Sequence, residues 1–116
     1  MYIDNLTIGE LKTLTGIINP AEKGHLHDVG PWQIGQNYFI RTVTFHYTGK
    51  LTGVTDHELT LDHAAWIADS GRFHEALESG NYTEVEMFPK NRSLIIGRGA
   101  IVDAITISAP LPTSNK

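Results

Sequence analysis

The fold is decided by the stretch Tyr38-Phe-Ile-Arg-Thr-Val-Thr-Phe-His-Tyr47, in which aromatic and β-branched residues dominate. These residue types favour the pleated, half-buried surface of a β-sheet, so the stretch predicts one long strand. Thr48-Gly49-Lys50 follows it and predicts a turn. Residues 51–55 then predict a second strand.

Further strands and one helix are predicted downstream. Residues 58–68 favour a third strand with Leu59, Leu61, Ala65 and Ile67 on one alternating face, although the Ala-rich residues 64–69 are also compatible with a helix. Ser70 is a suitable N-cap for a helix over 71–79, and Gly80 can end it. Additional strands are predicted at 83–88 and 93–96, and residues 100–108 are either a further strand or the continuation of the one at 93–96. The core over 37–109 is therefore predicted to be a single α+β domain, a mostly antiparallel and strongly bent sheet packed with one or two short helices.

Three segments lie outside this core. Thr7 and Glu10 have the spacing of a capping box and predict an N-terminal helix within residues 1–16. Residues 17–36 contain several glycines and prolines and predict a connector. Pro110 and Pro112 interrupt regular structure, so residues 110–116 are expected to form a loose tail.

Composition narrows the functional classes. The chain has 116 residues, a formal net charge of −4 and no cysteine. The acidic balance argues against binding of long nucleic acid, which needs a basic face, but it permits a small anionic ligand. Without cysteine there are no disulfides, thiolate metal sites or thiol nucleophiles. No apolar run approaches the ~20 residues that span a bilayer, and the first residues do not resemble a secretory signal, which predicts no membrane partner and a cytoplasmic location.

Arg41 is the first candidate binding residue. In the predicted strand it shares a face with Phe39, Val43 and other apolar side chains. A cation in such a place needs a partner, because an unpaired buried charge is costly. Two interpretations remain open, an internal salt bridge with one of the acids or contact with an anionic ligand.

Gly97-Arg98-Gly99 is the second candidate. Glycines let a backbone approach a ligand closely, and an arginine between them suits a phosphate because its guanidinium donates two parallel hydrogen bonds. Glycines also occur at bulges and tight turns, and this alternative stays open.

Aromatic and polar residues complete the candidate set. Trp66 and Phe73, with Arg72 beside them in sequence, could stack on a nucleobase, although large rings more often belong to the core. Asn91 and Asp103 lie near the glycine pair and could bond a ribose or a base edge. A turn asparagine and a surface aspartate are the alternative interpretations.

Metal binding and catalysis have less support. His25, His27 and Asp28 are close in sequence, but no third ligand follows at a recognisable spacing. The chain has no Gly-x-Ser-x-Gly elbow and no phosphate-binding loop of the Walker type. We therefore expect no metal, no cofactor and no enzymatic activity.

Three blocks carry a resemblance to known proteins. They are Tyr38-Phe-Ile-Arg-Thr-Val-Thr-Phe-His-Tyr-Thr-Gly49, Ala64-Ala-Trp-Ile-Ala-Asp-Ser-Gly-Arg-Phe73 and Ile96-Gly-Arg-Gly-Ala-Ile-Val-Asp103. From about residue 6 to the end, the chain resembles small phage and prophage proteins of the Thoeris anti-defence family, which are nucleotide sponges.

The resemblance implies a function and a set of roles. Such proteins bind cyclic ADP-ribose isomers, and some bind cyclic oligonucleotides at a separate site, without degrading them. It further implies a host-cytoplasmic homo-oligomer, either a dimer or a hexamer built from dimers. Arg41 and Arg98 would contact phosphates, and Trp66 or Phe73 would lie against adenine. The alternative is a structural phage accessory protein, or one that binds a host protein, for which an exposed apolar patch is expected.

Overall fold

The computed structural model describes residues 29–116. The predicted N-terminal helix, most of the connector, and the group His25, His27 and Asp28 lie outside the described residues. The described elements are β1 (Asn37–Thr42), β2 (His46–Val54), β3 (Glu58–Asp69), α1 (Phe73–Ser79), β4 (Glu84–Met87), β5 (Leu94–Gly97), the 3-10 turn η4 (Arg98–Ala100) and β6 (Ile101–Thr106).

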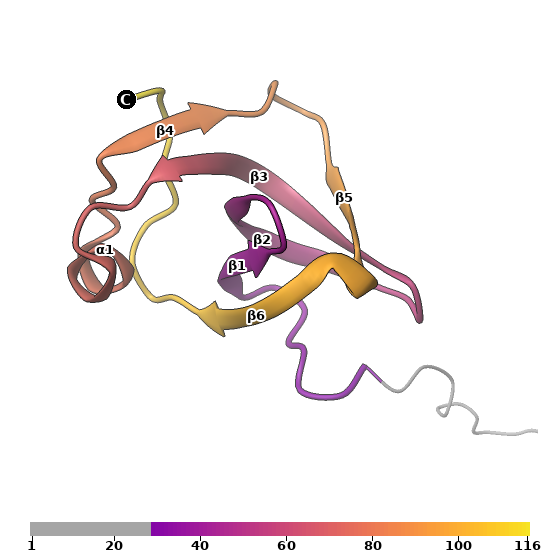
Figure 1. Ribbon diagram of the computed structural model, residues 1–116. Helices are drawn as coiled ribbons and strands as arrows, with labels where there is room; N and C mark the ends of the chain where they lie inside the picture. The colour runs from indigo at the N-terminus through magenta and orange to yellow at the C-terminus, as the bar shows by residue number, and fades with distance from the viewer. Residues whose placement is uncertain (1–28) are drawn as a thin grey trace, which may run out of the picture. The chain divides into compact units, whose positions relative to one another are not determined.

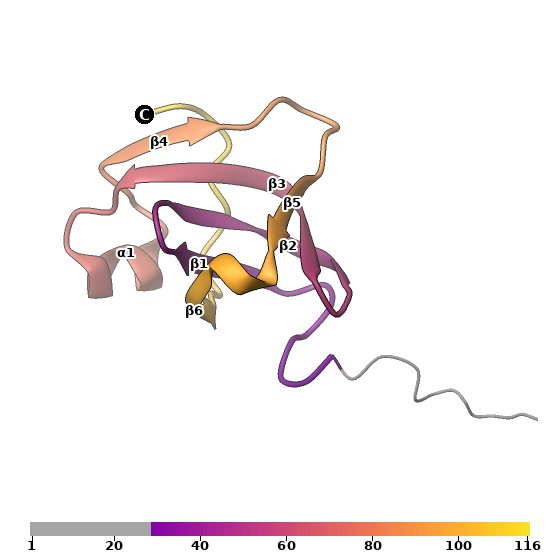
Figure 2. The same ribbon diagram turned by 45° about the vertical axis from the view of Figure 1, so that its right-hand side comes forward.

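The strands form one antiparallel sheet in the order β4-β3-β2-β1-β6 (Figure 1). The long strand β3 pairs with β4 through its second half and with β5 through its first half. β5 then leads through η4 into β6, which pairs with β1 (Figure 2). The predicted α+β class, with a mostly antiparallel sheet and a short helix, is confirmed.

The stretch 38–47 was predicted as one strand, and this prediction is wrong. β1 ends at Thr42, and the chain reverses before β2 begins at His46. The backbone N–H of Thr42 donates to the carbonyl of Phe45 at 2.8 Å, and the backbone N–H of Phe45 donates to the Thr42 hydroxyl at 2.9 Å. A threonine side chain therefore closes this tight turn without glycine or proline, which explains why composition did not reveal it.

The predicted turn at Thr48-Gly49-Lys50 is instead the middle of β2. A Cβ atom added to Gly49 would lie 2.9 Å from the Cβ of Leu61 on β3, closer than real Cβ atoms approach. Glycine at this position thus serves the close approach of two strands rather than a change of direction.

β3 is a strand throughout, which decides between the two alternatives for residues 64–69. Thr48 pairs with Ala65 while Lys50 pairs with Asp62, so β3 carries one extra residue between these pairs. His63 lies in this bulge with a φ of 53°. An extra residue moves the following side chains to the other face of the sheet.

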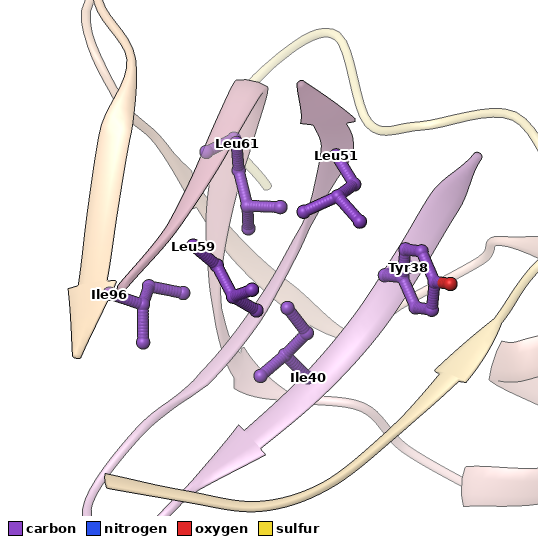
Figure 3. Packing of buried hydrophobic residues seen from close by; sticks show 7 residues of the cluster. Tyr38, Ile40, Leu51, Leu59, Leu61 and Ile96 are labelled. Carbon is purple, nitrogen blue, oxygen red and sulfur yellow. The ribbon is translucent and has the colours of Figure 1, made fainter. Parts of the chain in front are cut away.

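This bulge explains a second correction. Leu59, Leu61, Ala65 and Ile67 were expected on one face, but the first two belong to one core cluster and the last two to another. One cluster consists of Tyr38, Ile40, Leu51, Leu59, Leu61, Ala64 and Ile96, and its side chains from β1, β2, β3 and β5 converge in Figure 3. The other cluster consists of Phe39, Ala65, Ile67, Ala76, Tyr82, Val85 and Ile107.

The predicted helix is present but begins later. Its N-cap is Arg72 rather than Ser70, and Gly80 ends it with a φ of 75°. Asp69 Oδ1 accepts the backbone N–H of Gly71 at 2.8 Å, which turns the chain before the helix. Of its apolar side chains, Ala76 is buried, Leu77 is half-buried and Phe73 is 38% exposed.

The C-terminal residues, expected to be loose, return to the sheet. Ala109 is buried, and Lys116 exchanges two backbone hydrogen bonds with Val85 of β4, at 2.9 and 3.0 Å. The C-terminus accordingly lies beside β4 in Figure 1. Pro110 and Pro112 lie in a segment without regular strand structure, and they do not prevent it from packing.

We predict that Gly49→Ala destabilises the protein by about 1–3 kcal/mol, the usual cost of overpacking a filled site. The added methyl group would press on Leu61. Thermal or urea denaturation measures the effect. Gly97→Ala is the matched control, because a Cβ atom at this position would meet nothing within 4 Å and the φ of Gly97 is −67°. Equal stability of both variants would contradict the close approach.

Candidate functional site

Arg41 and Asp103 form a two-pronged ion pair between β1 and β6. Arg41 Nε donates to Asp103 Oδ1 at 2.8 Å, and Nη2 donates to Oδ2. The guanidinium also lies over the ring of Phe73, 5.2 Å from its centroid. The structure thus brings together three of the predicted ligand residues, but they satisfy one another, as the salt-bridge interpretation of Arg41 requires.

The ion pair perturbs both groups in the expected direction. The hydrogen bond from Arg41 lowers the pKa of the Asp103 carboxyl, and the same bond raises the pKa of the Arg41 guanidinium. The pair is partly open to solvent, with side-chain exposures of 41% and 49%.

Arg98 is occupied by backbone carbonyls of the β2–β3 hairpin. Its Nη1 donates to the carbonyl of Thr55 at 2.6 Å, and its backbone N–H donates to the carbonyl of His57 at 2.8 Å. Gly97 and Gly99 flank it in open space. Arg98 therefore ties η4 to the hairpin, which fits the alternative interpretation of a tight turn.

The remaining predicted residues are spread over the domain. Trp66 is 37% exposed, and its ring meets Phe45 edge-on with centroids 5.9 Å apart. Arg72 is exposed at the start of α1. Asn91 lies in the β4–β5 loop, on the wall of a cleft that neither Arg41 nor Arg98 lines.

This cleft, of about 930 Å³, is the strongest candidate site. It lies between the middle of the sheet, the β4–β5 loop and the C-terminal segment. Its walls are formed by Asn37, Lys50, Asp62, His63, Ala64, Met87, Phe88, Pro89, Lys90, Asn91, Arg92, Ser93, Leu111, Pro112 and Thr113. The volume falls in the range of roughly 300–1,000 Å³ that is usual for small-molecule sites.

Positive charge is concentrated in this cleft. The described residues include seven lysines and arginines against nine acidic residues, yet the cleft walls hold three cations and one carboxylate. Lys50 comes from β2, whereas Lys90 and Arg92 come from the β4–β5 loop, and all three are exposed. An acidic protein with this local excess has a site suited to an anion.

Two residues with left-handed backbone conformation lie in the same place. Among the described residues, the non-glycine residues with positive φ are His63, at 53°, and Asn91, at 62°. Both line the cleft. Histidine and asparagine adopt this region more readily than most other non-glycine residues, and the two positions are a bulge and a turn, so they shape the cleft walls without marking a function by themselves.

Polar groups in the cleft differ in how well they are satisfied. The Ser93 hydroxyl donates to Asp62 Oδ1 at 2.6 Å, so the one acidic group of the walls has a donor. The side-chain oxygen of Asn37 is buried without a hydrogen-bond partner. Because protein atoms enclose this oxygen, a ligand in the cleft does not reach it, and its missing hydrogen bond costs about 1–3 kcal/mol.

Sequence reasoning missed most of this site. Of its residues, it singled out Asn91, placed Lys50 in a turn and left Lys90 between two predicted strands. The signal available was the basic loop Pro89-Lys-Asn-Arg-Ser93. Its partner Lys50 lies forty residues away and could be joined to it only by the sheet register.

Comparisons with known proteins give no further guidance. No protein-family model, curated protein or solved structure matches the chain. Within residues 29–116, no group of three histidines or acidic residues could hold a metal ion. No helix in this part of the chain is long and apolar enough to cross a membrane.

We predict that in the Asp103→Asn variant the melting temperature falls less steeply than in the wild type as the pH is lowered into the acidic range. Because the folded protein lowers the pKa of Asp103, its contribution to stability is present above the unfolded value of about 4 and is lost as pH falls through the folded value. Melting temperatures between pH 2 and 7 measure this dependence. The control is Asp56→Asn, which changes an exposed carboxylate in the β2–β3 turn; an identical profile for both variants would show that the ion pair does not contribute.

Proposed function

We propose that the protein binds a small phosphorylated molecule in the cationic cleft and holds it without chemical change. The observation that carries this proposal is the convergence of Lys50, Lys90 and Arg92 on one cavity of an acidic protein. Guanidinium and ammonium groups are the side chains that best bind phosphate oxygens. The site proposed for the ligand is therefore this cleft, not the Arg41–Arg98 pair expected from the sequence.

The size and chemistry of the cleft favour a nucleotide over inorganic phosphate. A volume of about 930 Å³ exceeds what a single phosphate fills, and Phe88 supplies an aromatic wall. The ring of Phe88 also contacts Tyr47, with centroids 6.0 Å apart, which holds it in place. The exposed Asn91 offers a side-chain amide for a sugar or a base edge, and the Ser93 hydroxyl, which donates to Asp62, offers an acceptor.

The ligand class follows from the resemblance to the anti-defence sponges. We propose a cyclic nucleotide immune signal, with a cyclic ADP-ribose isomer as the first candidate and cyclic oligonucleotides as the second. Sequestration requires cations that bind the phosphates, an aromatic ring that packs on the base and backbone groups that hydrogen-bond the ligand. It does not require a nucleophile. The cationic side chains of the cleft would bind this phosphorylated signal in the cytoplasm of the host cell.

The test combines uptake with release. Purified full-length protein is titrated calorimetrically with a cyclic ADP-ribose isomer and with cyclic dinucleotides, then heated, and the released compound is analysed by mass spectrometry. Intact compound supports sequestration, altered compound indicates an enzyme, and absence of uptake contradicts binding of these nucleotides. Binding should weaken as salt concentration rises, because the contacts are ionic.

We predict that the double substitution Lys90→Ala and Arg92→Ala raises the dissociation constant at least ~10-fold, because each side chain would donate a charge-assisted hydrogen bond to a phosphate. Both side chains are exposed loop residues, so the melting temperature should change little. Arg98→Ala and Arg72→Ala are the matched controls, since each removes one cation outside the cleft. If the Arg98→Ala variant loses binding while the Lys90→Ala and Arg92→Ala double variant keeps it, the ligand binds at the Gly97-Arg98-Gly99 turn and not in the cleft.

A further inference from the structure

The β4 and β6 edges of the sheet differ in how the chain covers them. At the β4 edge, Lys116 exchanges backbone hydrogen bonds with Val85, and Asn115 Oδ1 accepts the backbone N–H of Met87 at 2.8 Å. At the other end of the sheet, β6 pairs with β1 on its inner side. Within residues 31–116, no strand pairs with the outer side of β6.

The register shows which backbone groups of β6 face outward. The carbonyl of Asn37 accepts the N–H of Ile107 at 2.9 Å. Hydrogen-bonded pairs recur at every second residue of an antiparallel ladder, so Ile105 opposite Phe39 also directs its backbone groups toward β1. By the same alternation, Ala104 and Thr106 direct their N–H and C=O groups away from the sheet.

The outer side of β6 has one of the usual protections of an edge strand, a bulge at Val102 near its start, and lacks the others. Natural edges often carry lysine, proline or an unpaired charge, but Ile101–Thr106 has neither lysine nor proline. Its one charged residue, Asp103, is neutralised by Arg41. Val102 is 64% exposed and Ile105 is 50% exposed. A groove of about 610 Å³, walled by Trp32 and Tyr38 among others, runs along the strand.

We propose that β6 pairs antiparallel with β6 of a second copy of this chain, about a twofold axis at Ile105. The edge is complementary to itself, because it is apolar and its carboxylate is already paired, so two acidic chains meet there without facing charges. The pairing joins two sheets into one and gives Ala104 and Thr106 backbone partners in the other copy.

The register is chosen by comparing which side chains would face each other for three positions of the twofold axis. Outward-facing residues must pair with outward-facing residues, which requires the axis to pass through a residue, and the residues near the middle of the regular part of β6 are Asp103, Ala104 and Ile105. An axis at Asp103 sets two carboxylates directly opposite each other. An axis at Ala104 sets each carboxylate against the exposed Ile105, whereas an axis at Ile105 sets it against Ile107, whose side chain is already buried in its own chain. The axis at Ile105 sets two half-exposed isoleucines together in a non-hydrogen-bonded pair, where side chains are closest.

The first test uses charge reversal at the axis. Sedimentation equilibrium of the full chain, over a wide concentration range, should give twice the monomer mass of 12.8 kDa. Ile105→Lys and Ile105→Glu each place like charges opposite themselves and should weaken self-association at least ~10-fold. Mixing the two variants should restore a dimer, because lysine then faces glutamate.

A second exposed isoleucine, outside the proposed interface, provides the control. Ile95 on β5 is 65% exposed, and Ile95→Lys should leave the dimer intact. Circular dichroism and melting curves establish that each variant is folded. A wild-type chain that stays monomeric, a dimer broken by Ile95→Lys, or a mixture that fails to reassociate would each overturn the proposal.

A cross-link provides an independent readout that does not depend on disruption. The chain has no cysteine, so Ile105→Cys introduces a single thiol. Cα atoms of a non-hydrogen-bonded pair are ~4.5 Å apart, within the range of about 4.4–6.8 Å that a disulfide spans. Mild oxidation should convert most of the Ile105→Cys variant to a covalent dimer, whereas the Ile95→Cys variant should remain largely monomeric; equal cross-linking of the two would refute the interface.

Discussion

The close approach of β2 and β3 is the constraint on which the domain depends. Gly49 lies against Leu61 where a larger residue would not fit, and the extra residue in β3 follows immediately, at His63. Together they bend the sheet and move the apolar side chains of β3 from one face to the other. The first half of β3 can therefore bury Leu59 and Leu61 in one cluster while the second half buries Ala65 and Ile67 in another.

The same constraint shapes the candidate site. The bulge places His63 on the cleft wall beside Asp62, opposite Lys50 on the neighbouring strand. The β4–β5 loop adds its cations from the other side, and the C-terminal segment adds a third wall. A binding cleft at an irregularity of a sheet has a physical basis, because the irregularity interrupts the regular ladder and turns side chains toward one point.

The sequence predicted the class of fold and most strands because alternating and β-branched residues are a direct signal of sheet. It did not predict the hairpin at Thr42 and Phe45, because the turn is closed by a threonine hydroxyl in a segment with strand-like composition. It misplaced Gly49, because glycine serves both turns and close approaches.

The prediction of the binding site was wrong for another reason. Arg41 was recognised as needing a partner, but only the β1–β6 register shows that the partner is Asp103. Likewise, no spacing along the chain links Lys50 with Arg92.

The left-handed conformations at His63 and Asn91 also limit which sequences can adopt this domain. Glycine, asparagine, aspartate and histidine tolerate that region of backbone space, whereas β-branched residues do not. Relatives that have diverged beyond detectable overall similarity should therefore still share this narrow choice of residues at two places, one before the Ala-Ala-Trp segment and one after the strand that ends at Met87. Such a pair of positions is a signature that a comparison of whole sequences would dilute, and it offers a way to find the lineage to which the chain belongs.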